Sequence, residues 1–380
     1  MTAYRGLTWD HPRGRDALVA AAAEWSDQID LRWDVHPLEG FESSPIEKLA
    51  ETYDLIVLDH PHLGDALAHD SLIPMTDLFS PDEIGVWAEA AVGPSLESYR
   101  FEGKVWALPL DAATQVSARR AELVEHAPET WTEVRELART VPVALSIAGP
   151  HAFLSFCSIA VALGEEPGTV PGESLISREA ARDVLSLMRE LVASGPASAH
   201  ALNPIQMLET MRRDDSIAYC PLIYGYVNYS RPRDARSISF GEAPAKEMGG
   251  RRGSTIGGTG IAVSRRCDVT EPLLELIRWL MSPRTQTRFI PAHNGQPSAR
   301  PAWTDPLVNA ASAGFFRSSL ATIESSWMRP RFPGYIAFQS AASALIRDAT
   351  TDAIGADDAL DRLEMLHRKA TTTTEGTVLA

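Results

Sequence analysis

The chain has 380 residues, 44% of them hydrophobic and 22% charged, with a formal net charge of -15. This length exceeds the size at which one hydrophobic core usually stops growing, so we expect two lobes that are folded almost throughout. The negative charge opposes the phosphate backbone and makes nucleic acid an unfavourable partner. The sequence has no apolar run long enough to cross a bilayer, so we expect a protein that is not inserted in a membrane.

The three cysteines Cys157, Cys220 and Cys267 lie far apart and form no C-x-x-C pair. This spacing indicates neither a zinc knuckle nor a redox motif, so we expect buried thiols, no metal and no cofactor. The first nine residues lack the basic and apolar regions of a signal peptide. We therefore expect the protein to lie outside the cytoplasm if an export signal has been removed, or in the cytoplasm if Met1 is the native start.

Strands alternate with helices from the beginning of the chain, which predicts an α/β fold. Residues 54–58 form a short, continuous apolar run, typical of a strand buried on both faces of a parallel sheet. In the N-terminal part we expect a strand at 4–9, a loop at 10–15, a helix at 16–25 and strands at 30–36, 54–58 and 103–111. Pro109 suggests that the last of these strands lies at an edge or a bend, and Asp111 marks its acidic end.

Helix-capping signals mark the next part of the chain. Thr130 with Glu133 is typical of a capping box, Ser177 is a weaker capping signal because Ala180 stands three residues after it, and Asn203 before Pro204 is typical of a helix start. From here on we expect helices at 131–139, 177–194, 203–213, 271–281, 306–319, 338–349 and 357–369, strands at 216–222 and 257–263, and a frayed tail at 371–380.

Four stretches in this order resemble the extracellular solute-binding proteins of carbohydrate-type ABC importers. They are residues 103–111 (GKVWALPLD), residues 128–131 (PETW), residues 257–264 (GGTGIAVS), and Gln286 with residues 294–298 (NGQPS). The resemblance implies a type II periplasmic-binding-protein fold, with two hinged α/β lobes, each a mostly parallel sheet flanked by helices, that close over a ligand. It implies residues 1–110 with 257–300 as lobe 1, residues 111–256 with 301–370 as lobe 2, and the ligand cleft between them. It also favours a location outside the cytoplasm, a monomer, and ABC permease subunits as partners.

The loop after the first strand carries the first candidate ligand residues, because open α/β sheets bind ligands outside the carboxyl ends of their strands. Trp9 offers a flat apolar face for a sugar ring, Asp10 accepts hydrogen bonds from hydroxyl groups, and His11 and Arg13 can donate them. The alternative is that Asp10 caps a helix and Arg13 is a solvated charge.

Asp59 and His60 follow the buried apolar strand and are expected at the same crevice. With His62 they also invite a metal site, which the intervening Pro61 and the lack of a third well-spaced ligand disfavour. Asp111 and Gln115 lie where the chain crosses lobes and are expected to bind hydroxyl groups. The alternative is a helix capped by Asp111, with Gln115 on its exposed face.

The remaining candidates lie further along the chain. Aromatic side chains suit the wall of a cleft that is exposed to water on one side, and glycines let backbone amides approach a ligand closely. At least one tyrosine of this set could instead be part of the core, and Arg331 could instead form surface salt bridges. These candidates are Tyr224, Tyr226, Gly257, Gly258, Asn294, Gln296, Trp327 and Arg331.

The sequence lacks the P-loop, H-E-x-x-H and G-x-S-x-G motifs, so we expect a binding protein rather than an enzyme. A glycosidase that uses two of Asp10, Asp59 and Asp111 is an alternative, because paired carboxylates carry no linear signature. A cytoplasmic ligand sensor on the same fold is another. The side chains favour a small sugar, a polyol or a sugar acid as the ligand.

Overall fold

The computed structural model describes residues 2–169, 172–231 and 236–378. The chain divides into two compact units. Unit 1 comprises Met1–Ala113, Gly257–Phe316 and Arg331–Pro333; unit 2 comprises Thr114–Ile256, Arg317–Pro330 and Gly334–Ala380. The chain therefore passes between the units more than once, as two-lobed proteins with discontinuous lobes do.

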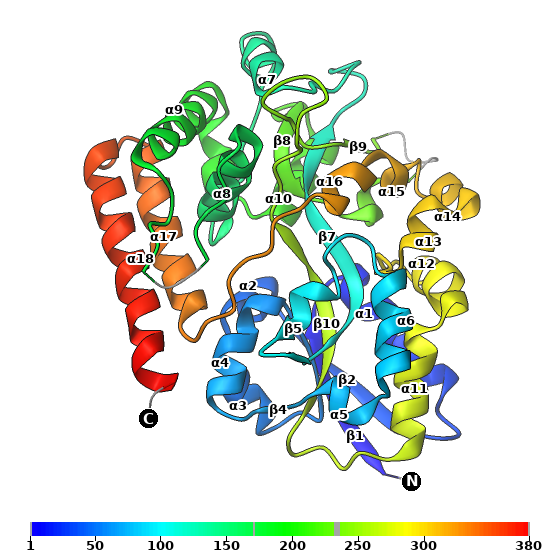
Figure 1. The fold of residues 1–380 in the computed structure, drawn as a ribbon. Coiled ribbons are helices and arrows are strands. Elements are labelled where there is room, and N and C mark those ends of the chain that lie inside the picture. Colours follow the sequence, from blue (N-terminus) through cyan, green and yellow to red (C-terminus); the bar gives the residue numbers. More distant parts are fainter. Residues whose placement is uncertain (1, 170–171, 232–235, 379–380) are drawn as a thin grey trace. The chain divides into compact units, whose positions relative to one another are not determined.

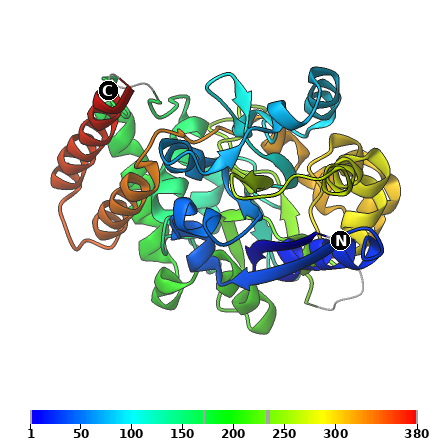
Figure 2. The same cartoon turned by 90° about the horizontal axis from the view of Figure 1, so that it is seen from below.

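Unit 1 contains a sheet with the strand order β2 (Asp30–His36), β1 (Ala3–Trp9), β3 (Leu55–Leu58) and β10 (Ile256–Ser264). β1 pairs in parallel with β2 and β3, and β10 is antiparallel to β3 and to the short strand β4 (Leu72–Ile73). Figure 2 shows β1 and β2 side by side. All four residues of β3 are buried, as the apolar run predicts for a central strand.

Helix α1 (Pro12–Glu24) starts earlier than the sequence analysis expects, inside the expected loop at 10–15. Pro12 occupies the first turn, where its missing N–H costs nothing, and the side chain of His11 accepts a hydrogen bond from the backbone N–H of Arg13. The helix cap is thus His11, and not Asp10, so Arg13 lies in the first helical turn.

Strand β7 (Leu108–Arg119) corrects two expectations about residues 103–111. The expected strand is interrupted after β6 (Lys104–Val105) and then continues through Asp111 to Arg119. Asp111 is therefore a mid-strand residue, and neither it nor Gln115 belongs to a helix. β7 passes from unit 1 to unit 2 between Ala113 and Thr114.

In unit 2, β7 pairs antiparallel with β8 (Tyr219–Tyr224) and β9 (Ser239–Gly241), and single parallel bridges join Val143 to Tyr219 and Thr255 to Trp327. The helices α8 (His151–Leu163), α9 (Arg178–Ser194), α17 (Tyr335–Thr350) and α18 (Ala356–Val378) pack together in this unit (Figure 1). α8 is buried on nearly all sides, so its apolar sequence shows no amphipathic stripe. The expectations from the sequence therefore do not include this helix.

The predicted caps are confirmed. Thr130 and Glu133 form a capping box at α7 (Trp131–Leu137), Asn203 and Gln206 form one at α10 (Pro204–Arg213), and Ser177 caps α9. α11 (Glu271–Met281) also has the expected bounds.

Two expectations near the C-terminus are corrected. The helix expected at 306–319 is two helices, α14 (Pro306–Ala311) and α15 (Phe315–Ser318), separated by Ala313 and Gly314, whose φ angles are 50° and 79°. This left-handed backbone ends a helix. The expected frayed tail continues α18 up to Val378. Among the described residues, no helix combines the length and the apolar character needed to span a bilayer.

Residues 301–316 belong to unit 1 and not, as the sequence analysis expects, to the second lobe. The indole Nε1 of Trp303 donates to the backbone oxygen of Pro297 at 2.8 Å, and Arg288 forms an ion pair with Asp305 at 2.9 Å. These contacts tie the segment to its neighbours in unit 1. Residues 331–333 and Asp111–Ala113 also belong to unit 1.

Candidate functional site

Trp9, His11, Arg13 and Asp111 form one buried cluster in unit 1, which we call the Trp9 cluster. The rings of Trp9 and His11 stack, with centroids 5.2 Å apart and planes 7° from parallel. The guanidinium carbon of Arg13 lies 5.6 Å from the centroid of the Trp9 ring. Gly14 makes room for the indole, because a Cβ there would lie 2.0 Å from Trp9 Nε1. All four cluster residues are among the ligand residues predicted from the sequence.

Arg13 and Asp111 form a two-point ion pair inside this cluster. Arg13 Nε donates to Asp111 Oδ2 at 2.7 Å, and Arg13 Nη2 donates to Oδ1. Only 4% of the Arg13 side chain and 6% of the Asp111 side chain are exposed. Burial raises the pKa of the Asp111 carboxyl, the positive charge of Arg13 opposes this shift, and the charge of Asp59 adds to it. The carboxylates of Asp59 and Asp111 are therefore near enough to interact.

The His11 ring is held in one protonation state. Its Nδ1 accepts a hydrogen bond of 3.1 Å from the Arg13 backbone N–H, so the proton of the neutral ring is on Nε2. Burial, together with the neighbouring charge of Arg13, lowers the pKa of His11 to about 3. His11 is thus a neutral hydrogen-bond donor at physiological pH.

Asp59 and His60 follow β3 and contact one another. Asp59 Oδ1 accepts the backbone N–H of His60 at 2.9 Å and lies 3.0 Å from His60 Nδ1. His60 also meets Tyr99 edge-to-face, and the Tyr99 hydroxyl donates to the Leu58 backbone oxygen at 3.0 Å. Among the described residues, no group of three His, Cys, Asp or Glu side chains is arranged to hold a metal ion.

Asp10 lies away from the Trp9 cluster. Its side chain is 54% exposed and pairs with Arg15 at 2.8 Å on the surface. Asn294, at a left-handed backbone position with φ of 66°, donates to the Asp16 carboxylate at 2.8 Å. Both residues therefore contribute to surface polar contacts of α1.

Three predicted ligand residues have structural roles close to the chain crossings. Gln296 Nε2 donates to the Ala112 backbone oxygen at 3.1 Å. Gly258 has a φ of 98°, and a Cβ there would lie 2.3 Å from the Asp111 backbone oxygen. The Gln115 amide bonds to two serines of α8, Ser155 and Ser158. Gly257, which is half-buried, is the first residue of β10 on the unit 1 side.

In unit 2, Tyr224 ends β8 and pairs with Gln115 in the ladder between β8 and β7. Its ring meets His151, the first residue of α8, edge-to-face at 5.9 Å. Tyr226 is buried and packs on Tyr229 at 6.3 Å. Trp327 is buried, and its backbone N–H donates to the Ser254 oxygen at 2.8 Å.

Arg331, considered from the sequence as a surface salt-bridge residue, contacts backbone oxygens and an aromatic ring of unit 1. Its Nη1 donates to the backbone oxygens of Glu97 and Ser98 at 3.3 and 3.1 Å, and its guanidinium lies over the Phe101 ring. Burial lowers the pKa of this guanidinium. Its neighbour Arg329 is buried in unit 2 and donates to the Gln339 side chain and to the Ile256 backbone oxygen.

Three residues near these candidates were not singled out by the sequence analysis. Phe41 packs on Trp9 with ring centroids 5.9 Å apart, Tyr99 contacts His60, and His151 contacts Tyr224. Each of these residues lies far in sequence from the residue that it contacts. Phe41 differs from the other two in that it closely follows strand β2. Only the position of Phe41 after a strand offers a local signal that sequence reasoning could have used.

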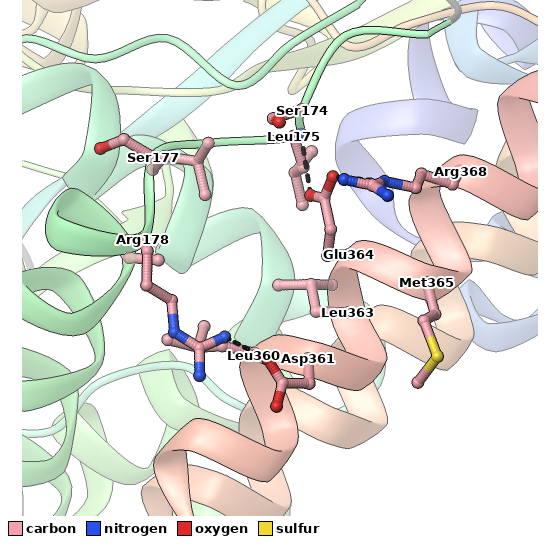
Figure 3. A pocket seen from close by; sticks show the side chains of 12 residues that line it. Ser174, Leu175, Ser177, Arg178, Leu360, Asp361, Leu363, Glu364, Met365 and Arg368 are labelled. Atoms are coloured by element: carbon pink, nitrogen blue, oxygen red, sulfur yellow. Dashed lines mark hydrogen bonds and ion pairs between the residues drawn. The ribbon is translucent and has the colours of Figure 1, made fainter.

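A hollow beside the C-terminal helix lies elsewhere in unit 2. A groove of about 400 Å3 runs between α18 and the segment that leads into α9 (Figure 3). Its charged rim is paired internally: Arg178 with Asp361 at 2.7 Å, and Arg368 with Glu364 at 3.0 Å. None of the predicted ligand residues lines it. Arg13 and Asp111 instead border a hollow of about 20 Å3 in unit 1, room for about one water molecule.

The fold is that of ABC-transporter solute-binding proteins. The chain is similar to a ribitol complex of such a protein from Agrobacterium radiobacter K84 (20% identity, TM-score 0.77, 97% of this chain and 98% of that chain). It is also similar to one from Thermotoga lettingae TMO bound with α-D-tagatose (13%, TM-score 0.81, 98% and 100%). A third similar structure is the cyclic α-maltosyl-1,6-maltose binding protein from Arthrobacter globiformis (15%, TM-score 0.76, 98% and 99%). No protein-family model and no curated protein sequence matches the chain.

Proposed function

We propose that the protein binds one small, neutral, hydroxyl-rich molecule, a polyol or a sugar, and releases it chemically unchanged. The observation that carries the proposal is the Trp9 cluster. An indole face, a neutral histidine and a paired arginine and aspartate gather in unit 1, with Trp9 at the carboxyl end of β1. Solved structures with this fold hold ribitol and tagatose.

The charges in the Trp9 cluster favour a neutral ligand over a sugar acid. Asp111 already neutralises Arg13 with two hydrogen bonds. A carboxylate on the ligand would compete with Asp111 for the guanidinium and would face the like charge of Asp59. A neutral polyol can hydrogen-bond to these groups without breaking the ion pair.

The proposed ligand residues are Trp9, His11, Arg13, Asp59 and Asp111 from unit 1 and Tyr224, Tyr226 and Trp327 from unit 2. We further propose that the ligand is enclosed between the two units and delivered to an ABC permease. The support for this step is the resemblance to ABC-transporter solute-binding proteins.

A thermal-shift screen tests the proposal with ribitol, D-tagatose and maltose as neutral ligands and D-gluconate as the acid. A true ligand at 100 times its Kd adds about 2.7 kcal/mol to the free energy of unfolding. We expect at least one neutral compound to raise the melting temperature and D-gluconate to have no effect. Trp9→Ala should abolish the shift, and Trp25→Ala, which alters another unit 1 tryptophan, should preserve it. A shift with D-gluconate alone would contradict the assignment of a neutral ligand.

A further inference from the structure

Strand β2 lies at one end of the unit 1 sheet. It pairs in parallel with β1 over all seven of its residues, and among the described strands it has no second neighbour. The backbone oxygen of His36 accepts the Asp10 N–H at 2.8 Å, which shows that His36 and every second residue before it direct their backbone groups toward β1. The N–H and C=O groups of Leu31, Trp33 and Val35 therefore point to the open edge.

An open edge of this length is a template for another strand, because its outward N–H and C=O groups can bond to a second chain. Proline and β-bulges commonly prevent such pairing. β2 has the sequence DLRWDVH, without proline, and its register with β1 is continuous. Charged side chains are the remaining protection, and their order decides whether they repel or attract a second copy.

The acidic and basic side chains of β2 all lie on one face. Asp30, Arg32 and Asp34 alternate with apolar residues and share the face on which β1 carries Arg5. Arg5 pairs with Asp34 at 2.6 Å, and Arg32 with Asp30 at 3.4 Å. The side chain of Arg32 is 81% exposed, that of Asp34 46% and that of Asp30 40%. These side chains also border an open hollow of about 520 Å3, so a partner can reach them.

Two β2 strands can pair antiparallel over their full length in one register. Since β2 runs from residue 30 to residue 36, the twofold axis of this register passes Trp33, whose backbone groups point outward. Arg32 of each copy then lies opposite Asp34 of the other. This is a non-hydrogen-bonded pair, the kind in which facing side chains are closest. Asp30 lies opposite His36.

The neighbouring registers bring like charges together. A shift of two residues is the smallest that keeps each side chain on its own face. In one direction it places Arg32 opposite itself and Asp30 opposite Asp34, and in the other it places Asp34 opposite itself. Like charges directly opposite destabilise a strand pair, and opposite charges stabilise it. The order of charges therefore favours the register in which all seven residues pair.

We propose that two copies of this chain form a twofold dimer by antiparallel pairing of their β2 edges, with two Arg32–Asp34 ion pairs across the axis. The contact uses the open β2 edge of both copies, so assembly stops at two chains. Seven residues from each copy make a small interface, so the dimer is weak and reversible. It departs from the monomer that the family resemblance favours, and it does not depend on the proposed ligand.

Sedimentation velocity of the whole chain tests the dimer, over protein concentrations from about 1 μM to 1 mM. We expect the sedimentation coefficient to rise from that of a monomer to that of a dimer and no further. A monomer over the whole range, or growth beyond the dimer, would overturn the proposal.

Charge reversal tests the register. Arg32→Glu puts a carboxylate opposite Asp34, and Asp34→Lys puts an ammonium group opposite Arg32, so each variant alone should dimerise at least about tenfold more weakly than the wild type. An equimolar mixture of the two should recover the dimer. In the mixed dimer the new glutamate of one chain faces the new lysine of the other, and the native Asp34 faces the native Arg32. A structural role of either residue would not produce this recovery.

Arg265→Glu is the matched control, because it reverses another exposed arginine of unit 1, which pairs with Asp70 outside β2. We expect it to dimerise like the wild type. Circular dichroism checks that each variant is folded, and Arg32→Glu decides alone if Asp34→Lys does not fold. Undiminished dimerisation of Arg32→Glu, no recovery in a mixture of two folded variants, or equal weakening in the control would overturn the proposal.

Discussion

The buried ion pair of Arg13 and Asp111 is the most consequential single interaction in the candidate site. Removing one partner of such a pair leaves an uncompensated buried charge, which typically costs about 3–5 kcal/mol. Asp111→Asn should therefore lower the free energy of unfolding by this order, as measured by urea denaturation. Asp10→Asn is the control, because the Asp10 pair with Arg15 is exposed and should change stability by less than about 1 kcal/mol. Equal effects of the two substitutions would show that the pair is not buried.

The lowered pKa of His11 predicts that the free energy of unfolding depends on pH. Its pKa is lowered from 6.5 to about 3 in the folded protein, so the unfolded chain binds the proton first as the pH falls. This histidine should therefore reduce the free energy of unfolding as the pH falls from about 6.5 toward 3. His11→Asn keeps a capping acceptor but cannot take up a proton. The free energy of unfolding of this variant should fall less over this pH range than that of the wild type. An equal fall in both proteins would show that His11 does not cause the pH dependence.

The sequence could single out Trp9, His11, Arg13 and Asp111 as candidates, because Trp9 ends β1, His11 and Arg13 follow it closely, and Asp111 lies in the stretch that resembles the lobe crossing. It could not show that Gln115 and Gln296 have structural roles. A glutamine has the same local signal whether its amide faces a ligand or a buried serine. Only the contact of Gln115 with Ser158, 43 positions along the chain, distinguishes the two cases.

At the scale of the element, Gly258 has a strict steric requirement in β10. Its φ is 98°, and a Cβ would lie 2.3 Å from the Asp111 oxygen, a backbone atom that cannot rotate away. Gly258→Ala should destabilise the protein by at least about 1–3 kcal/mol. Gly85→Ala provides the contrast, because Gly85 lies inside helix α6 (Pro81–Ala90) with no atom near its Cβ position. That substitution should stabilise by up to about 1 kcal/mol. Thermal unfolding of both variants measures the difference, and a neutral Gly258→Ala would contradict the close strand contact.

Elements with local start and stop signals could be predicted from the sequence. The caps at Thr130, Ser177 and Asn203 begin helices as expected, and the apolar run at 54–58 is a central strand. Elements defined by long-range packing could not. α8 lacks an amphipathic stripe because it is buried nearly all round, and the break at Ala313 places a residue other than glycine in left-handed backbone.

At the scale of the whole molecule, the resemblance of four short stretches predicted the fold, which the similar solved structures confirm. The unit boundaries were harder to predict, because the chain returns to unit 1 for only three residues, Arg331–Pro333. That short return depends on close packing: a Cβ at Gly64 would lie 2.3 Å from the Arg331 oxygen. Such a contact has no signature in the sequence around residue 331.

Calorimetric titration of the purified protein with ribitol, D-tagatose and maltose tests the central claim most directly. We expect at least one of them to bind saturably at one molecule per chain and to be recovered unchanged. We expect Trp9→Ala to lose the binding heat while remaining folded. The absence of binding heat with all three compounds, or conversion of the bound compound into a product, would contradict it.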